Sequence, residues 1–204
     1  MQLNNYFVPE FSNPAQPVRV NTIFSVHDIA EIQRLLSNIE YTKALVDLDE
    51  NTPGENKEVR RSKIKWIDIS PETDWLYERI TSIMKQNNQI YWRFNLRDMP
   101  MSIQYTEYHA TDEGRYDWHM DMGHGETSCR KLSTSILLSN TSDFEGGKLQ
   151  FFKGGKAGEE IFEYPLNNPG DMVIFPSYMI HRVTPVTKGI RRSLVLWVGG
   201  EPFK

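Results

Sequence analysis

Hydrophobic and polar positions divide the chain into two parts with different periodicities. In the first part, apolar residues recur at helical spacing over residues 25–40 and again over residues 71–87. Ser25 is placed to cap the first of these helices, and Ser70, which precedes a proline, to cap the second. From residue 90 onwards, short segments rich in β-branched and aromatic residues alternate with turns. The pattern predicts a mainly β protein with N-terminal helices.

The β-rich part consists of short candidate strands separated by turns that contain glycine, asparagine or aspartate. Many short strands of this kind favour a sandwich or a barrel, and helices that come first favour an antiparallel sheet covered on one side. We expect one domain over residues 1–204, with residues 1–89 as a helical and irregular N-terminal buttress and residues 90–199 as the core. The candidate strands are residues 90–95, 101–109, 115–121, 131–139, 148–152, 160–164, 171–176, 179–185 and 191–199.

Two segments of the first part lack helical periodicity. Residues 1–24 contain three prolines that would interrupt a β-ladder, so we expect irregular or edge structure there. Residues 49–62 are polar and contain Pro53 and Gly54, which predicts a loop. Such a loop is either a lid over a binding site or a solvated insertion, and the sequence favours neither. Residues 63–69 alternate apolar and polar side chains and are expected to form a strand.

Composition narrows the expected partners and compartment. The chain has 204 residues and a net charge of −4, which is not the basic surface typical of a nucleic-acid-binding protein. Its single cysteine, Cys129, cannot form an internal disulfide, and a lone thiol is typical of a reducing compartment. The N-terminal residues do not resemble a signal peptide, and no apolar run reaches the roughly 18 residues of a membrane helix. We therefore expect a cytoplasmic protein with no membrane or nucleic-acid partner.

A His-x-Asp motif formed by His119 and Asp121 carries the clearest candidate chemistry. Residues two apart on a strand point to the same face, so both side chains could bind one metal ion. A distant histidine, His181, would complete a set of two histidines and one carboxylate, which leaves positions open and suits non-haem Fe(II). Asp117 has the same strand parity and is the alternative carboxylate. His124 follows in a glycine-flanked loop and is expected at the rim.

Arg191 and Ser193 form the second candidate element. On a strand, Arg191 and Ser193 share a face with Val195 and Trp197, whereas Arg192 belongs to the opposite face. A buried guanidinium needs an anion, and its planar fork suits the far carboxylate of a dicarboxylate. We therefore expect Arg191 to bind an anion and Arg192 to be an ordinary exposed arginine.

Four ordered elements together resemble the Fe(II)- and 2-oxoglutarate-dependent dioxygenases. Within these, the chain is similar to the prolyl 4-hydroxylase-like branch, including the bacterial PKHD-type hydroxylases. The resemblance covers roughly residues 90–199 and implies a double-stranded β-helix, or jelly-roll, whose N-terminal helices buttress one sheet. The elements are His119-x-Asp121, PGDMVIFPS (169–177), His181-Arg-Val-Thr-Pro and Arg191-x-Ser193.

Matched position by position, the resemblance implies that His119, Asp121 and His181 bind iron. It implies that Arg191 pairs with the C5 carboxylate of 2-oxoglutarate and that Ser193 supplies a hydroxyl beside it. Two further residues would complete the co-substrate pocket, namely the apolar Val183 and Tyr108, with Tyr105 as the alternative. The branch's second tyrosine is absent here: Leu137 and Leu138 stand in its strand, so that contact is missing or supplied by Ser133 or Thr134.

The implied activity is hydroxylation of a C–H bond, foremost on a peptidyl proline, with release of succinate and CO2. The implied cofactors are Fe(II), 2-oxoglutarate and O2, with ascorbate as a candidate reductant, and no catalytic residue is expected beyond the metal site. We place Tyr116, His124, Trp197 and Arg60 at the substrate rim, and expect a peptide or small-molecule substrate and a monomer or homodimer. The alternatives are an oxygenase acting on a small molecule or free amino acid, a cupin-like metal enzyme that does not use 2-oxoglutarate, and a non-catalytic jelly-roll binding module.

Overall fold

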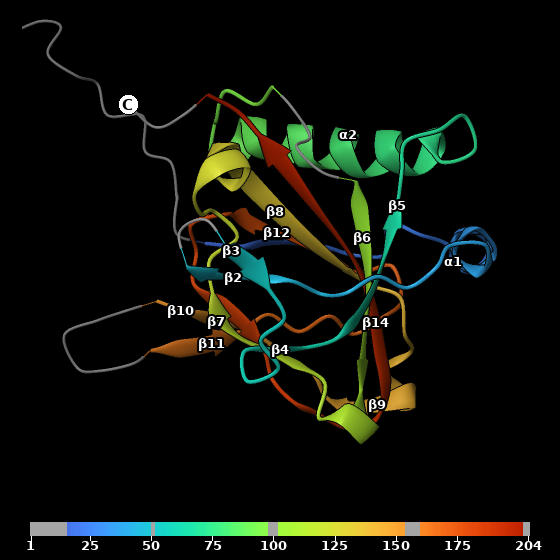
Figure 1. The fold of residues 1–204 in the computed structure, drawn as a ribbon. Helices are drawn as coiled ribbons and strands as arrows, with labels where there is room; N and C mark the ends of the chain where they lie inside the picture. The colour runs from blue at the N-terminus through green and yellow to red at the C-terminus, as the bar shows by residue number, and fades with distance from the viewer. Residues whose placement is uncertain (1–15, 50–51, 98–101, 154–159, 202–204) are drawn as a thin grey trace, which may run out of the picture.

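The computed structural model describes residues 16–49, 52–97, 102–153 and 160–201. Within these ranges the protein is mainly β, with two α-helices that both precede the long antiparallel strands (Figure 1). No helix of the described part is long and apolar enough to cross a membrane.

Helix α1 (Val26–Ser37) forms at the position that the sequence predicts. Ser25 caps it, because its hydroxyl accepts a hydrogen bond from the Asp28 amide while the Asp28 carboxylate accepts one from the Ser25 amide. The helix buries Ile32, Leu35 and Leu36. It ends at Ser37, three residues before the predicted end.

Helix α2 (Asp74–Tyr91) is displaced towards the C-terminus relative to the prediction. Residues 71–73 form a turn, and Thr73 rather than Ser70 occupies the N-cap position. The helix also runs through the start of the predicted strand 90–95, so that strand is wrong. The cause is Asn88, whose side-chain amide donates to the Phe94 carbonyl and accepts from the Phe94 amide, which turns the chain back at the end of the helix.

Most strands belong to two sheets within the described residues. The seven-stranded sheet has the order β1-β12-β8-β14-β6-β5, and β9 pairs with β14 outside this path. Its strands are β1 (Val18–Val20), β12 (Met172–Pro176), β8 (Arg130–Leu137), β14 (Val186–Gly199), β6 (Ile103–His109), β5 (Lys63–Ile67) and β9 (Phe144–Gly146). The five-stranded sheet has the order β11-β10-β13-β7-β4. Its strands are β11 (Ile161–Glu163), β10 (Leu149–Phe152), β13 (His181–Val183), β7 (Arg115–His119) and β4 (Arg60–Arg61).

Part of the loop predicted over residues 49–62 forms strands in the described residues. A two-stranded hairpin, β2 (Val46–Asp49) with β3 (Thr52–Gly54), begins the segment, and β4 ends it. Strand β4 pairs with β7, which places Arg60 opposite Tyr116. Residues 1–89 were expected to form only a helical and irregular support. They also contribute β1 and β5 to the seven-stranded sheet and β4 to the five-stranded sheet. The described residues also contain the short 3₁₀ helices η1 (Ala110–Asp112), η2 (Gly125–Cys129) and η3 (Thr141–Asp143).

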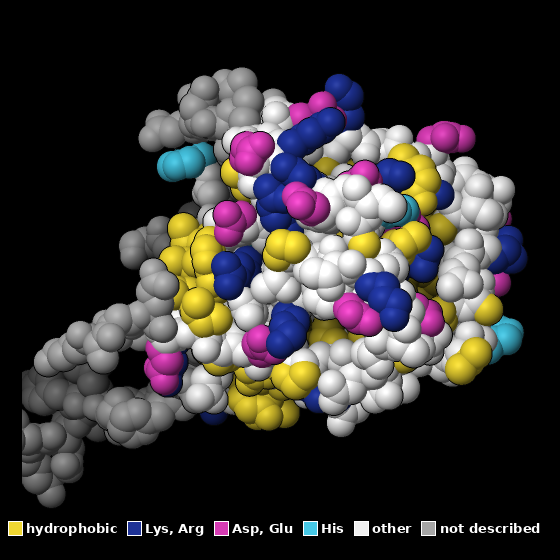
Figure 2. All heavy atoms as spheres, turned by 90° about the horizontal axis from the view of Figure 1, so that it is seen from below, with side chains coloured by type: hydrophobic (Ala, Val, Ile, Leu, Met, Phe, Trp, Pro, Cys, Tyr) yellow, Lys and Arg dark blue, Asp and Glu magenta, His cyan; other side chains and the backbone are white. Residues whose placement is uncertain are grey.

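The hydrophobic core lies in two layers on either side of the seven-stranded sheet. The helices pack on its first face, where Ile80 of α2 and Leu194 and Leu196 of β14 belong to one buried cluster. The second face lies towards the five-stranded sheet, and Phe151, Val173 and Phe175 belong to the cluster on that side. Seen from below, the surface mixes acidic and basic side chains (Figure 2). The space between the sheets also contains a cavity of about 700 Å³.

Candidate metal and co-substrate site

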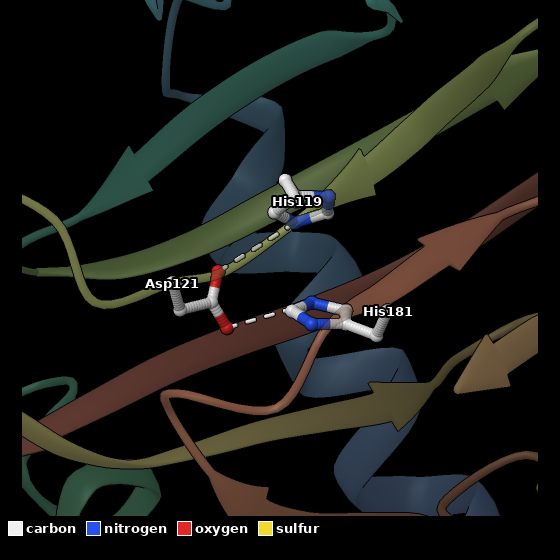
Figure 3. A group of neighbouring side chains, drawn as sticks. All are labelled: His119, Asp121 and His181. Atoms are coloured by element: carbon white, nitrogen blue, oxygen red, sulfur yellow. Dashed lines mark ion pairs between the residues drawn. The ribbon is translucent and has the colours of Figure 1, made fainter. Parts of the chain in front are cut away.

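His119 and His181 face each other across two neighbouring strands at one end of this cavity. His119 is the last residue of β7, His181 is the first of β13, and the antiparallel register pairs them directly. Their rings lie 4.2 Å apart, centroid to centroid. Asp121 lies two residues after the end of β7, and its carboxylate points at both rings (Figure 3). Its oxygens lie 3.7 Å from Nε2 of His119 and 3.6 Å from Nε2 of His181.

Hydrogen bonds to the backbone hold the segment that carries Asp121 in place. The predicted strand 115–121 ends at His119, so strand alternation does not orient Asp121. Instead, the amides of Asp121 and Met122 both donate to the carbonyl of Ser177, and Arg130 donates to the Asp121 carbonyl. These bonds hold the loop after β7 against Ser177, which directly follows β12.

The imidazoles are oriented for binding through Nε2. Nδ1 of His119 lies 2.7 Å from the Asp117 carbonyl, and Nδ1 of His181 lies 2.9 Å from the Met179 carbonyl. A carbonyl can only accept, so each Nδ1 carries the proton and each Nε2 presents a lone pair towards Asp121. This is the tautomer that a metal ligand requires.

The local electrostatics favour the same protonation states. Burial, together with the adjacent His181, lowers the pKa of His119 to about 3. Burial alone would raise the pKa of Asp121, but His181, His119 and Arg130 outweigh it and hold that pKa below its usual value. Near neutral pH the site therefore combines a neutral His119 with an ionised carboxylate.

The donor set fits a single metal ion. The ligand atoms of His119, Asp121 and His181 all lie within 4.8 Å of one another, and no other such group of histidine, cysteine or acidic residues occurs in the described ranges. Separations of 3.6 and 3.7 Å between carboxylate and imidazole are too long for hydrogen bonds but are spanned by an ion with bonds of about 2 Å to each ligand. Two imidazoles and one carboxylate are typical of non-haem iron sites with open positions.

Arg191 lines the same cavity and is 2% exposed. Its Nη1 donates to the Ser193 hydroxyl over 3.0 Å, and its guanidinium lies 5.7 Å from the centre of the Tyr108 ring. Among the described residues no carboxylate lies within 4.0 Å of it, and burial lowers its pKa. A buried guanidinium without an acidic partner fits a ligand anion that enters the cavity.

Arg192 points the other way, as the alternation of β14 predicts. Its Nε lies 3.1 Å from Oε1 of Glu107, a partner that Arg191 lacks. Ser193, Val195 and Trp197 line the cavity with Arg191. Leu194 belongs to the helix-side core, so the two faces of β14 are assigned correctly by their periodicity.

A model of the 2OG-Fe(II) oxygenase superfamily matches residues 103–199, from β6 to the end of β14. This segment contains all three metal-ligand candidates and Arg191. Over these residues the chain is similar to the 2OG-Fe(II) oxygenase superfamily. Within the superfamily its similarities lie in the prolyl 4-hydroxylase-like branch, as the ordered motifs predict.

One curated relative of this chain is a PKHD-type hydroxylase of Synechococcus sp. (strain CC9605). It is 39% identical over 83 residues, which are 41% of this chain and 36% of the relative. The chain thus matches little more than a third of that relative's length.

Solved structures share the fold over most of the chain. A prolyl hydroxylase from Trichoplax adhaerens, in complex with a hypoxia inducible factor peptide fragment, has a TM-score of 0.73 and 16% identity. The match covers 92% of this chain and 84% of that one. A Pseudomonas putida prolyl-4-hydroxylase has a TM-score of 0.63 and 19% identity, with 91% and 92% covered. The mainly β structure with two helices is consistent with the jelly-roll fold of 2OG-Fe(II) oxygenases.

The other residues predicted for the co-substrate pocket lie at the cavity. Tyr108 and Val183 are both buried and line it. Tyr105, the alternative to Tyr108, is wrong, because it faces the helix-side core and its hydroxyl donates to Glu107 over 2.6 Å. Asp117 is also excluded as the carboxylate, since it is exposed and its side chain accepts a bond from the Trp118 amide.

The four residues expected at the substrate rim all line the cavity, but they differ in depth. His124 is exposed in the loop before η2. Trp197 is 6% exposed, and the Arg130 guanidinium lies 4.2 Å from its ring centre. Tyr116 is deeper than a rim position, because its ring stacks on that of His119 at 3.5 Å with an interplanar angle of 12°. Arg60 covers the other side of Tyr116, 4.7 Å from its centre.

Sequence reasoning missed Gly147, which it treats only as a turn residue. Gly147 has a φ of +58°, and a Cβ there would lie 2.7 Å from Cδ of Arg191. The missing side chain thus leaves room for the arginine. The glycine pair in a turn gives the only sequence signal, and it does not reveal this contact.

A row of cavity residues across three strands was also missed. The register pairs Val195 of β14 with Gln104 of β6 on one side and Ser135 of β8 on the other, and all three line the cavity. The fallback hydroxyls named for the missing tyrosine both have partners in the protein, and Thr134 also lines the cavity. Ser133 lies 2.9 Å from the Ser177 hydroxyl, and Thr134 donates to the Val173 carbonyl. Leu137 lies directly opposite Ser193 on the neighbouring strand and is buried.

Proposed function

We propose that this protein is an Fe(II)- and 2-oxoglutarate-dependent dioxygenase that hydroxylates a C–H bond, with release of succinate and CO2. One observation carries the proposal: the His119, Asp121 and His181 group opens into the cavity that also buries the unpaired guanidinium of Arg191. A metal site and a dicarboxylate site in one cavity are what this reaction needs. The two facing sheets would then form the double-stranded β-helix of the family.

Each of these residues has a separate part in the proposal. His119, Asp121 and His181 hold Fe(II), with the imidazoles fixed in the binding tautomer by backbone carbonyls. Arg191 and the Ser193 hydroxyl bind the C5 carboxylate of 2-oxoglutarate. Iron and 2-oxoglutarate supply the oxidising chemistry with O2.

Further cavity residues orient the co-substrate and keep water away. Tyr108 lies beside Arg191, and burial raises its pKa, so its phenol stays protonated and can donate a hydrogen bond to the co-substrate. Val183 is buried and apolar and lines the cavity, where it limits water beside the co-substrate.

We propose a peptidyl proline as the foremost substrate. The support is indirect: the PKHD-type and prolyl hydroxylase names of the similar proteins, and the peptide in the complex from Trichoplax adhaerens. Tyr116, Trp197, Arg60 and His124 line the cavity, and His124 is exposed to a substrate that approaches it. The alternative substrates are a small molecule or a free amino acid.

The test is conversion of 2-oxoglutarate to succinate by purified protein with Fe(II), O2 and ascorbate, with and without candidate substrates. The panel contains proline peptides, free amino acids and nucleotides, and product mass identifies the hydroxylated compound. Succinate formed only with Fe(II), and raised by a proline peptide, supports the proposal. Metal binding without 2-oxoglutarate turnover would favour a cupin-like enzyme, and the absence of both would favour a binding module.

A further inference from the structure

Arg60 is a buried arginine whose charge no acidic group balances. It is 9% exposed, and its Nε donates to the Ser62 hydroxyl over 2.9 Å. Among the described residues no carboxylate lies within 4.0 Å of its guanidinium, and no other hydrogen bond joins it to the protein. Burying a guanidinium in this way is unfavourable unless an anion approaches it.

Other buried or half-buried arginines of this protein show the contrast. Arg192 pairs with Glu107 and Arg19 with the fully buried Asp171. In the cavity lining, neither Arg60 nor Arg191 has a carboxylate within 4.0 Å among the described residues. The third arginine there, Arg130, donates to the Asp121 carbonyl and lies over the Trp197 ring. Arg191 is the proposed partner of 2-oxoglutarate, so Arg60 is left for a different anion.

The geometry leaves one end of Arg60 available. The flat guanidinium lies over the Tyr116 ring at 4.7 Å, and Tyr116 in turn stacks on His119. With one face on the ring and Nε on Ser62, the two terminal nitrogens are the free donors. Side by side, they match the two oxygens of a carboxylate.

The charges around the cavity favour an anion as well. Its charged lining residues are Lys43, Arg60, Arg130 and Arg191 against Asp121 and Glu126. Fe(II) would offset Asp121, and one carboxylate of 2-oxoglutarate would offset Arg191. The remaining field on the substrate side is positive, which attracts anions and repels cations.

We propose that Arg60 binds a carboxylate of the substrate, so that the protein selects a substrate bearing an acidic group near the carbon that is hydroxylated. This inference rests on the proposed function and narrows its substrate class. The carboxylate has two possible sources in a peptide, an acidic side chain and a free C-terminus. Both present the same two oxygens to the guanidinium.

Matched peptides test the inference by binding. Isothermal titration uses the full chain loaded with Mn(II), which does not turn over, and 2-oxoglutarate. One pair of N-acetylated proline pentapeptides differs only by Glu against Gln beside the proline, and another by a free against an amidated C-terminus. In at least one pair the acid should bind about 10- to 100-fold more tightly, the range of a charge-assisted hydrogen-bonded pair. The pair that discriminates identifies the source.

Variants of neighbouring arginines provide the control. Arg60→Gln should abolish the preference for the acid, and Arg60→Lys, which keeps the charge without the fork, should reduce it. Arg61→Gln should retain the preference, because Arg61 is adjacent on β4 but pairs with Glu113. The inference is overturned if the wild type prefers the acid in neither pair, if the preference survives in Arg60→Gln, or if Arg61→Gln loses it equally.

The proposed function is judged separately from this binding experiment. Wild-type succinate formation without any peptide reports whether the iron and 2-oxoglutarate sites are active. Succinate formation together with equal binding of acid and amide would contradict only the carboxylate assignment. No succinate formation under any condition would contradict the proposed function instead.

Discussion

His119, Asp121 and His181 supply every protein ligand in the proposed iron site. Replacing any one of them by alanine should abolish tight Fe(II) binding, because two remaining donors do not fix the ion. The fold should persist, since the ligand side chains bond to each other only through the ion. Metal titration monitored by calorimetry measures the first effect, and circular dichroism the second. Asp117→Ala is the matched control and should bind Fe(II) like the wild type.

Arg191 and Arg192 are adjacent but have different partners. Comparing their alanine variants therefore tests which arginine binds 2-oxoglutarate. Arg191→Ala should weaken 2-oxoglutarate binding by roughly 2–5 kcal/mol, the cost of removing one partner of a buried charge pair. Arg192→Ala should leave that affinity nearly unchanged and should instead lower the free energy of unfolding, because it leaves Glu107 with one donor fewer. Equal losses of 2-oxoglutarate affinity in both variants would show that the co-substrate binds elsewhere.

For single residues, the sequence predicts which side chains lie near one another at the site, but not which of them are in direct contact. The His-x-Asp spacing, the later His181 and the alternation around Arg191 were enough to locate the site. The stack of Tyr116 on His119 could not be predicted, because it depends on the register shift between His181 and Val183 where β13 meets β7. A β-bulge of this kind changes which residues are neighbours without a clear sequence signal.

Glu107 joins β6 to β14 and gives the fold a pH-dependent element. Burial would raise its pKa, but hydrogen bonds from Tyr105, His109, Tyr41 and Arg192 outweigh it and lower the pKa to about 2. A depressed pKa stabilises the fold above the ordinary value of 4.5, and this stability is lost as pH falls from there towards 2. This contribution disappears as the Glu107 carboxylate becomes protonated and loses its charge-assisted hydrogen bonds.

Urea unfolding of the wild type and Glu107→Gln at several pH values measures this contribution. The glutamine cannot ionise, so the wild type should be more stable at pH 7, and the difference should shrink below pH 4.5. Glu40→Gln, at an exposed position after α1, controls for the change in net charge. A difference that stays constant down to pH 2 would mean that Glu107 contributes no charge-dependent stability.

The boundaries of elements were harder to predict than their existence. Helix α1 begins where the Ser25 and Asp28 capping box places it, which is a local signal. Helix α2 ends through a side-chain contact between Asn88 and Phe94, and helical spacing does not encode that contact. Strand β4 was missed because its two residues are polar and gain their place only by pairing with β7.

The whole molecule depends on its first 89 residues for both sheets and for the helix-side core. Removing residues 1–89 deletes β1, β4 and β5 and also Ile32, Leu76 and Ile80 from the buried cluster. We predict that residues 90–199 alone do not unfold cooperatively, whereas the full chain unfolds in one transition. Tryptophan fluorescence in urea gives the comparison. A cooperative transition for residues 90–199 would show that the core is an independent domain.

The order of strands in the sheets could not be derived from periodicity. The sequence indicates a sandwich or barrel, but the resemblance to a known family, rather than spacing, pointed to the jelly-roll. Pairings such as β1 with β12 join residues far apart in sequence, through the contacts of Arg19 and Thr22 with Asp171. Such contacts are visible only in three dimensions.

The central claim is that Fe(II) and 2-oxoglutarate bind together in the cavity between His119 and Arg191. Anaerobic titration with both tests it most directly, because Fe(II) bound together with 2-oxoglutarate would give a visible charge-transfer absorption that neither gives alone. The wild type should develop this absorption at one equivalent of each only when both are present. His181→Ala should not develop it, and Arg191→Ala should require more 2-oxoglutarate. A wild type that binds Fe(II) but shows no absorption change at saturating 2-oxoglutarate would contradict the claim.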